Sequence, residues 1–237
     1  MDIYRPPVTV AASTPRVNVN EVMKGVYMWM TAGLGTSALV AVLFAATGLT
    51  LTLYPAYILF LFAELGLVWY LSARIMRMPA QRATTMFLIY AALNGATLSV
   101  ILYAFALSDI YVALFATAAM FGAMSIVGYT TTVDLSKMGS LLFMALIGLI
   151  VASIVNIFLA SSALYWIVSY AGVIIFTGLT AYDTQRIKNQ VVLIDQMSAE
   201  GDTATLTRRV SILGALILYL DFVNLFLFIL RIVGRRR

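Results

Sequence analysis

Seven long apolar stretches follow one another along this chain, and each is long enough to cross a bilayer as a helix. A membrane-spanning helix needs about 20 apolar residues, because in lipid the backbone must satisfy its hydrogen bonds within the segment. Only 11% of the residues are charged, against roughly 25% in soluble domains, and a soluble helical bundle would need polar faces that these segments lack. The sequence therefore predicts an all-α polytopic membrane protein, a seven-transmembrane-helix bundle. The expected spans are residues 22–46, 54–74, 84–107, 110–132, 138–160, 163–186 and 208–232.

The polar segments predict three regions along the chain. We expect a polar N-terminal tail at residues 1–20, a seven-helix transmembrane domain at 21–233 and a basic C-terminal tail at 234–237. The links between spans are short, except for a long polar loop expected between the sixth and seventh spans, KNQVVLIDQMSAEGDTATLTRR.

The lysines and arginines predict the orientation of the chain. With a cytoplasmic N-terminus, the cytoplasmic segments hold eleven of the fifteen basic residues and the outer links of the first six spans hold none. The positive-inside rule therefore favours this orientation. The other four residues, Arg231 and Arg235 to Arg237, follow the seventh span. Two alternatives remain: the last segment crosses and leaves the basic tail outside, which we favour, or it re-enters and returns to the cytoplasm.

Three acidic residues fall inside expected spans, namely Glu64, Asp183 and Asp221. An intramembrane carboxylate costs free energy unless it is paired, hydrated or protonated, so each marks a functional-site candidate. Asn224 follows Asp221 by three residues and shares its helix face. Because the seventh span is apolar nearly all round apart from this carboxylate, we expect it to be central in the bundle.

The chain contains no histidine and no cysteine. Any proton-linked switch near neutral pH would therefore have to use carboxylates, and thiol chemistry and soft metal ligands are excluded. Asp183 and Asp221 would share a proton if they lay in contact, and Arg74 or Arg77 at the inner end of the second span could neutralise one of them. The expected depths of the two aspartates conflict, however. Asp221 lies about 18 Å of helix beyond Arg209 at the start of its span, whereas Asp183 lies only three residues from Arg186 at the end of its own.

That conflict leaves a second interpretation of Asp183 open. It lies only three residues before Arg186 and five before Lys188, so it could simply end the sixth span beside these cations.

Several motifs resemble the Bax inhibitor-1 family, the transmembrane Bax-inhibitor-motif proteins, and specifically its bacterial inner-membrane branch. They are VYMWMTAGL, ALNGATLSVIL, FGAMSIVGYTTTVDLSKMG, GLTAYDTQRIK and LYLDFVNLFLFILR. The resemblance implies a seven-helix bundle with a central seventh helix that acts as a pH-sensitive cation leak, chiefly for Ca²⁺. It further implies that Asp183 and Asp221 form the gate and pH sensor, and that Arg74, or Arg77 one turn away, is the latch.

The same residues predict how ions and other partners meet the protein. We expect Glu64 and Asn224 beside an ion path and weak Ca²⁺ binding by Asp183 and Asp221, since Ca²⁺ prefers hard oxygen ligands. Protons and the lipid bilayer are the other expected partners. No cofactor is expected, and the basic residues are too scattered along the chain to predict nucleic-acid binding.

Two other functions compete with the leak. The segments Tyr182–Asp183 and Leu218–Tyr219–Leu220–Asp221 resemble the YD and GxGD motifs of intramembrane aspartyl proteases, but the glycines of the second motif are replaced by bulky residues. We therefore expect no enzyme activity. A non-conducting regulator of other membrane proteins is the remaining alternative.

Overall fold

The computed structural model describes residues 18–197 and 203–235, and within these residues all regular secondary structure is helical. Seven helical segments are long and apolar enough to cross a membrane, which confirms the predicted all-α, seven-span architecture. The long helices are α1 (Val19–Ala46), α3 (Tyr57–Arg74), α4 (Ala80–Leu98), α6 (Leu107–Thr130), α7 (Ser136–Leu159), α8 (Ser162–Met197) and α9 (Thr203–Val233). Three short helices complete them: α2 (Leu49–Thr52), η1 (Tyr54–Ala56), which leads into α3, and α5 (Ile101–Ala104), which follows α4.

The expected terminal tails lie largely beyond this part of the chain. Residues 1–17 of the N-terminal tail and residues 236–237 of the C-terminal tail are outside the described residues.

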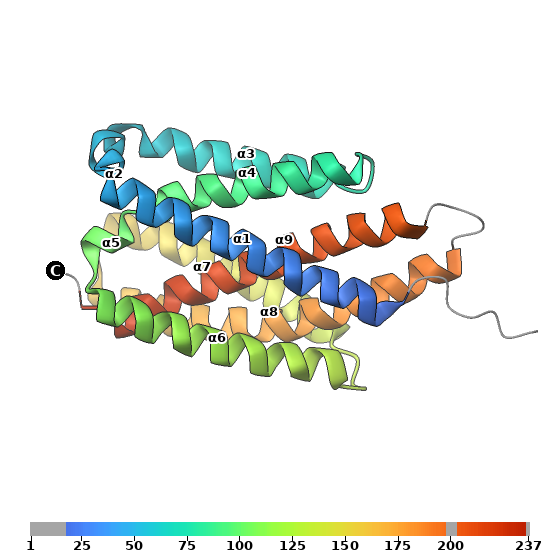
Figure 1. Ribbon diagram of the computed structural model, residues 1–237. Coiled ribbons are helices and arrows are strands. Elements are labelled where there is room, and N and C mark those ends of the chain that lie inside the picture. The colour runs from blue at the N-terminus through green and yellow to red at the C-terminus, as the bar shows by residue number, and fades with distance from the viewer. Residues whose placement is uncertain (1–17, 198–202, 236–237) are drawn as a thin grey trace, which may run out of the picture.

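The helix α9 packs against four other long helices, α1, α4, α6 and α8 (Figure 1). In its most apolar stretch 61% of the residues are buried, a larger share than in any other span of the described chain. Among its fully buried side chains are Leu216, Leu218, Tyr219 and Leu225. Because so many faces of α9 are covered by protein, polar groups on this helix are shielded from lipid.

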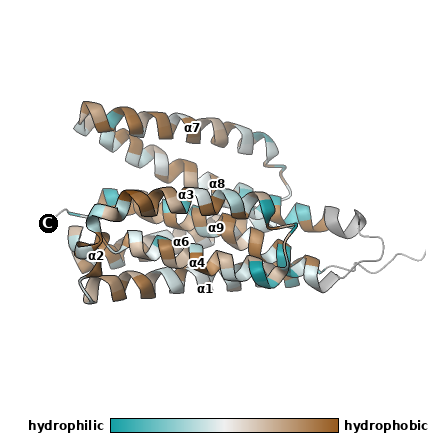
Figure 2. Cartoon of the chain, turned by 90° about the horizontal axis from the view of Figure 1, so that it is seen from above, coloured by the Kyte–Doolittle hydropathy of each residue, from teal (hydrophilic) through white to brown (hydrophobic). Residues whose placement is uncertain are grey.

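The helices α3 and α7 lie at the edges of the bundle, where α3 packs mainly on α4 and α7 on α8. Only 11% and 6% of the residues in their apolar stretches are buried. Apolar residues make up most of both helices (Figure 2), and their exposed side chains include Trp69 and Phe158. Large exposed apolar surfaces are costly in water, so these two helices are built to face lipid.

Glycines let two pairs of helices approach until their backbones touch. A Cβ at Gly95 on α4 would collide with the backbone of Ser37 on α1, and a Cβ at Gly128 on α6 would collide with the backbone of Ala181 on α8. Close backbone contact favours van der Waals attraction, which drives helix association in lipid because burial of apolar side chains gains little there.

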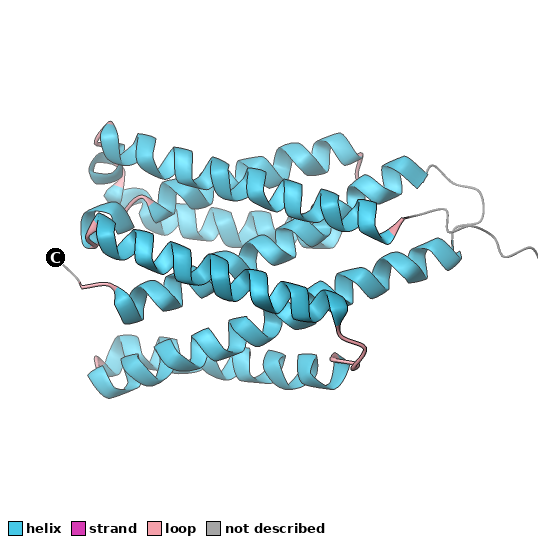
Figure 3. Ribbon diagram, turned by 60° about the horizontal axis from the view of Figure 1, so that its bottom comes forward, coloured by secondary structure: helices cyan, strands magenta, loops and turns pink. Residues whose placement is uncertain are grey.

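The expected long loop after the sixth span is wrong. Instead, α8 continues through Met197 and α9 begins at Thr203, so the residues between them are 198–202 (Figure 3). The extension is amphipathic, and Ile187 and Val191, four residues apart, are both buried against the bundle. Polar residues on its other face made this stretch look like a loop, although a single apolar stripe is enough to hold a helix.

The third span is also less regular than expected, because it breaks between α4 and α5 at Ser99. The Ser99 hydroxyl donates to the Ala96 carbonyl at 2.6 Å and accepts from the Thr50 hydroxyl at 2.8 Å. The Tyr57 hydroxyl also donates to the Ala96 carbonyl, at 2.9 Å. Side chains therefore tie the link after α1 and the start of α3 to this break.

The N-terminal end of α1 and the C-terminal end of α9 lie at opposite ends of the bundle (Figure 1). The chain leaves α9 beside the start of α6, where the Arg235 backbone N–H donates to the Asp109 carboxylate at 2.9 Å. The last segment thus runs the full length of the bundle without turning back within the described residues.

Candidate functional site

Two buried aspartates meet where α8 packs against α9. Asp183 is 8% exposed and Asp221 is 5% exposed, and their carboxyl groups lie within hydrogen-bonding reach of each other. The expected conflict in depth disappears because α8 is longer than the sequence indicated. Asp183 lies 14 residues before the end of α8 at Met197, and Asp221 lies 18 residues after the start of α9 at Thr203. Both therefore sit well inside their helices.

Contact between two carboxyl groups requires a proton. Two ionised carboxylates offer only acceptors and repel each other, so the pair is held together only while one proton lies between them. One carboxyl oxygen of Asp221, Oδ2, is buried and accepts no hydrogen bond from a donor group of the described residues. An unpartnered buried oxygen is costly, so the pair is poised to accept a proton or a cation.

Arg186 is the cation nearest to the pair. Its Nη1 lies 3.8 Å from Asp183 Oδ1, and the Arg186 side chain is 51% exposed. Such an ion pair is screened by solvent and worth little, so it does not replace the shared proton. Lys188 points elsewhere, since its Nζ donates to the Tyr129 carbonyl at 2.7 Å. Asp183 therefore does not end a helix beside two cations, since α8 continues to Met197.

A cavity of about 940 Å³ opens beside the aspartates, and residues of α7, α8 and α9 line it. Both aspartates, Arg186 and Asn224 contribute to its wall, together with apolar side chains of α7. The Asn224 Nδ2 donates to the Leu220 carbonyl at 2.8 Å, a bond within α9. The amide oxygen of Asn224 is thus available as a third oxygen ligand near the pair.

The structure does not bring Glu64 to this cavity. Glu64 is buried on α3, where its carboxylate accepts from the Thr97 hydroxyl and from Asn94 Nδ2 at 3.1 Å. The side-chain oxygen of Asn94, Oδ1, in turn accepts from the Tyr219 hydroxyl at 2.9 Å. Glu64 therefore belongs to a separate polar network between α3, α4 and α9, and it does not line the cavity that Asn224 lines.

The expected latch arginines also lie away from the pair. Arg74 and Arg77 are exposed, neither lines the cavity, and neither forms an ion pair within residues 18–197 and 203–235. Arg74 ends α3, whose main packing partner is α4 rather than α8 or α9. In this conformation the cation beside Asp183 is Arg186, on the same helix, and not Arg74.

Polar neighbours of the pair were missed by sequence reasoning. Gln185 donates to the Val133 carbonyl at 2.8 Å and accepts from the Leu135 N–H at 2.9 Å, so it fastens the link between α6 and α7 to α8. Thr184 bonds to the Ser125 hydroxyl at 3.2 Å, and Ser125 bonds to the Tyr27 hydroxyl. The run of polar residues after Asp183 was the only available signal for these contacts.

The donors suit weak binding of a hard cation. The described residues contain no cluster of three or more His, Cys, Asp or Glu side chains that could hold a metal ion. At this cavity the oxygen ligands come from three residues, the two aspartates and Asn224. Ca²⁺ takes six to eight oxygens, and water would have to supply the rest.

Comparison with known proteins places the chain in a family. A family model described as "Inhibitor of apoptosis-promoting Bax1" matches residues 19–237. The inner membrane protein YbhL of Escherichia coli K12 is 49% identical over 94% of this chain and 95% of its own length. An uncharacterized protein of Deinococcus radiodurans is 41% identical over 92% of both chains, and an uncharacterized membrane protein of Streptococcus pyogenes serotype M3 is 36% identical over 92% of this chain and 94% of its own. The chain is therefore an integral membrane protein that belongs to the Bax inhibitor-1 family.

Proposed function

We propose that this protein is a pH-sensitive cation leak, chiefly for Ca²⁺, and that the Asp183–Asp221 pair gates it. The observation that carries the proposal is the contact between two buried carboxyl groups in the wall of a cavity. Because the contact depends on one shared proton, loss of that proton leaves two like charges together. Helices α8 and α9 must then separate, or a cation must enter between the carboxylates.

The surroundings of the pair support ion passage. The cavity offers oxygen ligands from Asp183, Asp221 and Asn224 along its wall of otherwise apolar residues. A path conducts when binding is strong enough for an ion to enter and weak enough for it to leave. Protons and Ca²⁺ would compete for the same carboxylate oxygens, which would make the flux depend on pH.

The surroundings of Asp221 argue against proteolysis. An intramembrane aspartyl protease must admit an extended substrate backbone beside its second aspartate. Here Leu218 and Tyr219, just before Asp221, are fully buried and packed in the bundle. Side chains of this size leave no room for a peptide strand, so we propose that the pair serves gating and not hydrolysis.

The proposal is tested by Ca²⁺ flux from proteoliposomes across a pH series, with purified wild type, Asp183→Asn, Asp221→Asn and the double variant. We expect each single change to flatten the pH dependence of the flux, because an asparagine amide replaces the shared proton without titrating. The double variant should differ little from either single one, since a coupled pair titrates as a unit.

Asp134→Asn is the matched control for this experiment. Asp134 lies in the exposed link between α6 and α7, where hydrogen bonds from Ser136 lower the pKa of its carboxyl group. It therefore stays ionised near neutral pH, and its replacement should leave the pH profile unchanged. Normal pH profiles in both single variants, or effects that simply add, would overturn the gate. Wild-type vesicles that leak no faster than empty ones would instead favour a non-conducting regulator.

We also propose that the N-terminus faces the cytoplasm of a bacterial inner membrane. The end of the bundle that holds the start of α1 and the α3–α4, α6–α7 and α8–α9 links carries most of the basic residues. This distribution follows the positive-inside rule, and the name of the E. coli relative supports the inner membrane.

A further inference from the structure

A second cavity, on another face of the bundle, lies between α1 and α6. It has a volume of about 620 Å³, and residues 20–30 of α1 and 121–130 of α6 line it. Both helices pack against α9 and α8, so the cavity is a groove between two neighbouring spans. Its volume lies within the range of about 300–1,000 Å³ that is usual for small-molecule sites. The groove shares no lining residue with the cavity of the aspartate pair.

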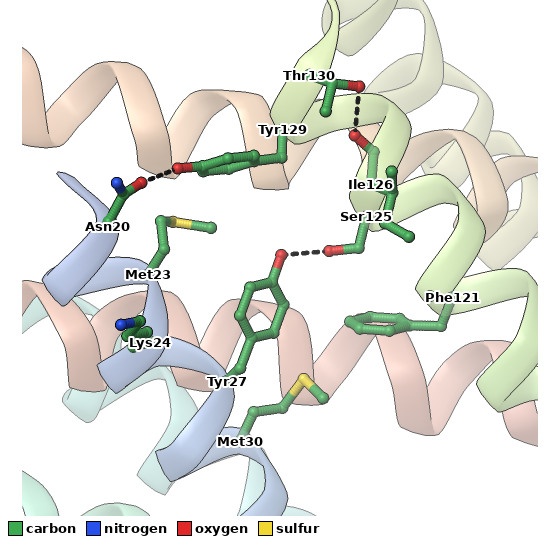
Figure 4. A pocket seen from close by; sticks show the side chains of 11 residues that line it. Asn20, Met23, Lys24, Tyr27, Met30, Phe121, Ser125, Ile126, Tyr129 and Thr130 are labelled. Carbon is green, nitrogen blue, oxygen red and sulfur yellow. Dashed lines mark hydrogen bonds between the residues drawn. The ribbon is translucent and has the colours of Figure 1, made fainter.

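The two ends of the groove differ in chemistry. At the end where α1 begins, Asn20, Lys24, Tyr129 and Thr130 line the wall (Figure 4). Lys24 is exposed and is the only charged residue of the described lining. The first turn of α1 adds the positive end of a helix dipole at this level, and the acidic residue of that turn, Glu21, does not line the groove. This end of the groove therefore favours a negatively charged group.

The rest of the groove is apolar. Met23, Met30, Phe121 and Ile126 face it, and methionine side chains adapt easily to flexible apolar ligands. Two hydrogen bonds cross the groove, from the Tyr129 hydroxyl to Asn20 and between the hydroxyls of Tyr27 and Ser125 (Figure 4). Because both helices span the membrane, the molecules at hand to fill such a groove are lipids.

We propose that this groove binds one anionic phospholipid, with its headgroup phosphate at Lys24 and an acyl chain along Met30 and Phe121. Charge complementarity selects the occupant: a lysine without an acidic partner in the lining sits at the polar end of an apolar groove. Basic pockets between transmembrane helices bind anionic headgroups in this way. The site is independent of the proposed ion path.

The proposal is tested with brominated lipids, which quench a nearby tryptophan. Ile126 faces the groove and is 66% exposed, so Ile126→Trp accommodates a probe there once the three native tryptophans are replaced by phenylalanine. In nanodiscs, brominated phosphatidylglycerol should quench this probe at a several-fold lower mole fraction than brominated phosphatidylcholine. Lys24→Gln should reduce that preference about fivefold, since one basic residue near the membrane contributes about that factor.

Three controls separate the site from general lipid contact. A chain with Trp69 as its sole tryptophan reports the bulk lipid, because Trp69 is 76% exposed on the edge helix α3. The two probes are matched in depth, since Trp69 lies five residues before the end of α3 and Ile126 lies four residues before the end of α6. Lys137→Gln removes an exposed lysine from the same end without touching the groove, and Lys24→Arg should restore the preference. Equal lipid preference at the two probes, or equal effects of Lys24→Gln and Lys137→Gln, would overturn the proposal. Relief of quenching by excess inorganic phosphate would also overturn it, because the site would then hold a free anion.

Discussion

At the scale of single residues, polar side chains in this bundle are arranged in separate networks. Asp183 and Asp221 contact each other beside a cavity, whereas Glu64 is held by Asn94 and Thr97 in a network of its own. The carboxylate of Glu64 has donors on both oxygens, while Asp221 keeps one buried oxygen without a partner. Of the two acidic sites, the aspartate pair is therefore the one left open to bind something.

The Tyr219 hydroxyl joins the Glu64 network to the first helix. It donates to Asn94 Oδ1 at 2.9 Å and lies 2.7 Å from the Ser37 hydroxyl, in a fully buried position. Tyr219→Phe keeps the ring but leaves the Asn94 oxygen without its donor, which typically costs about 1–3 kcal/mol. We expect the free energy of unfolding, measured by denaturant titration in mixed micelles, to fall by that amount.

Tyr111→Phe is the matched control for this change, because Tyr111 is 66% exposed on α6. Its free energy of unfolding should remain within about 0.5 kcal/mol of wild type. Equal stability of the Tyr219→Phe and Tyr111→Phe variants would show that the buried hydroxyl contributes nothing to the fold.

The sequence could predict the two aspartates but not all of their partners. The sequence alone shows a carboxylate inside an apolar run, so Asp183, Asp221 and Glu64 were all identified as intramembrane. Which carboxylates meet depends on how each helix is rotated and where it ends, and neither is encoded by local pattern alone. For the same reason Arg74 was expected at the pair, although it is exposed at the end of an edge helix.

At the scale of helices, packing in this protein depends on backbone contact as well as on side chains. Gly128 brings α6 against the Ala181 backbone of α8, just two residues before Asp183. A backbone cannot move aside as a flexible side chain can. This contact therefore fixes how far α6 lies from the helix that carries the aspartate.

Gly128→Ala should push α6 away from α8. Overpacking of a close contact costs about 1–3 kcal/mol, so we expect a lower melting temperature in detergent. Gly148→Ala is the control, because a Cβ at that exposed position on α7 meets nothing within 4 Å, and alanine favours a helix over glycine by up to about 1 kcal/mol. A Gly128→Ala variant that melts at or above the Gly148→Ala variant would contradict the close contact.

The helix boundaries show how far the apolar pattern carries. Span number and approximate limits follow from hydrophobic length, because a bilayer imposes a minimum. The extension of α8 past Arg186 was missed, since its buried stripe of Ile187 and Val191 is narrow and polar residues interrupt the apolar ones along it. The break at Ser99 depends on hydroxyls from two other elements, which a local pattern does not contain.

At the scale of the whole molecule, the basic residues are divided unevenly between the two ends of the bundle. One end holds Lys24, Arg74, Arg77, Arg82, Lys137, Arg186, Lys188, Arg208 and Arg209, and the other holds Arg231 and Arg235. The groove with Lys24 lies at the basic end, and Arg186 lines the aspartate cavity. Each of the two proposed sites therefore includes one basic residue of that end.

The number of crossings decides where the C-terminus lies. Seven spans place the two termini on opposite sides, and α9 runs the length of the bundle to end beside the start of α6, where Asp109 binds the Arg235 backbone. We therefore expect a reporter fused after residue 237 to register as periplasmic in a bacterial host. A reporter in the α3–α4 link after Pro79 should register as cytoplasmic, and one in the α7–α8 link after Ala160 as periplasmic.

The four basic residues near the C-terminus oppose this orientation, but adjacent charge only biases insertion, and the first six spans carry the larger bias. A cytoplasmic reporter at residue 237, with the two internal reporters as expected, would mean that the last segment re-enters the membrane, and the packing of α9 described here would be wrong.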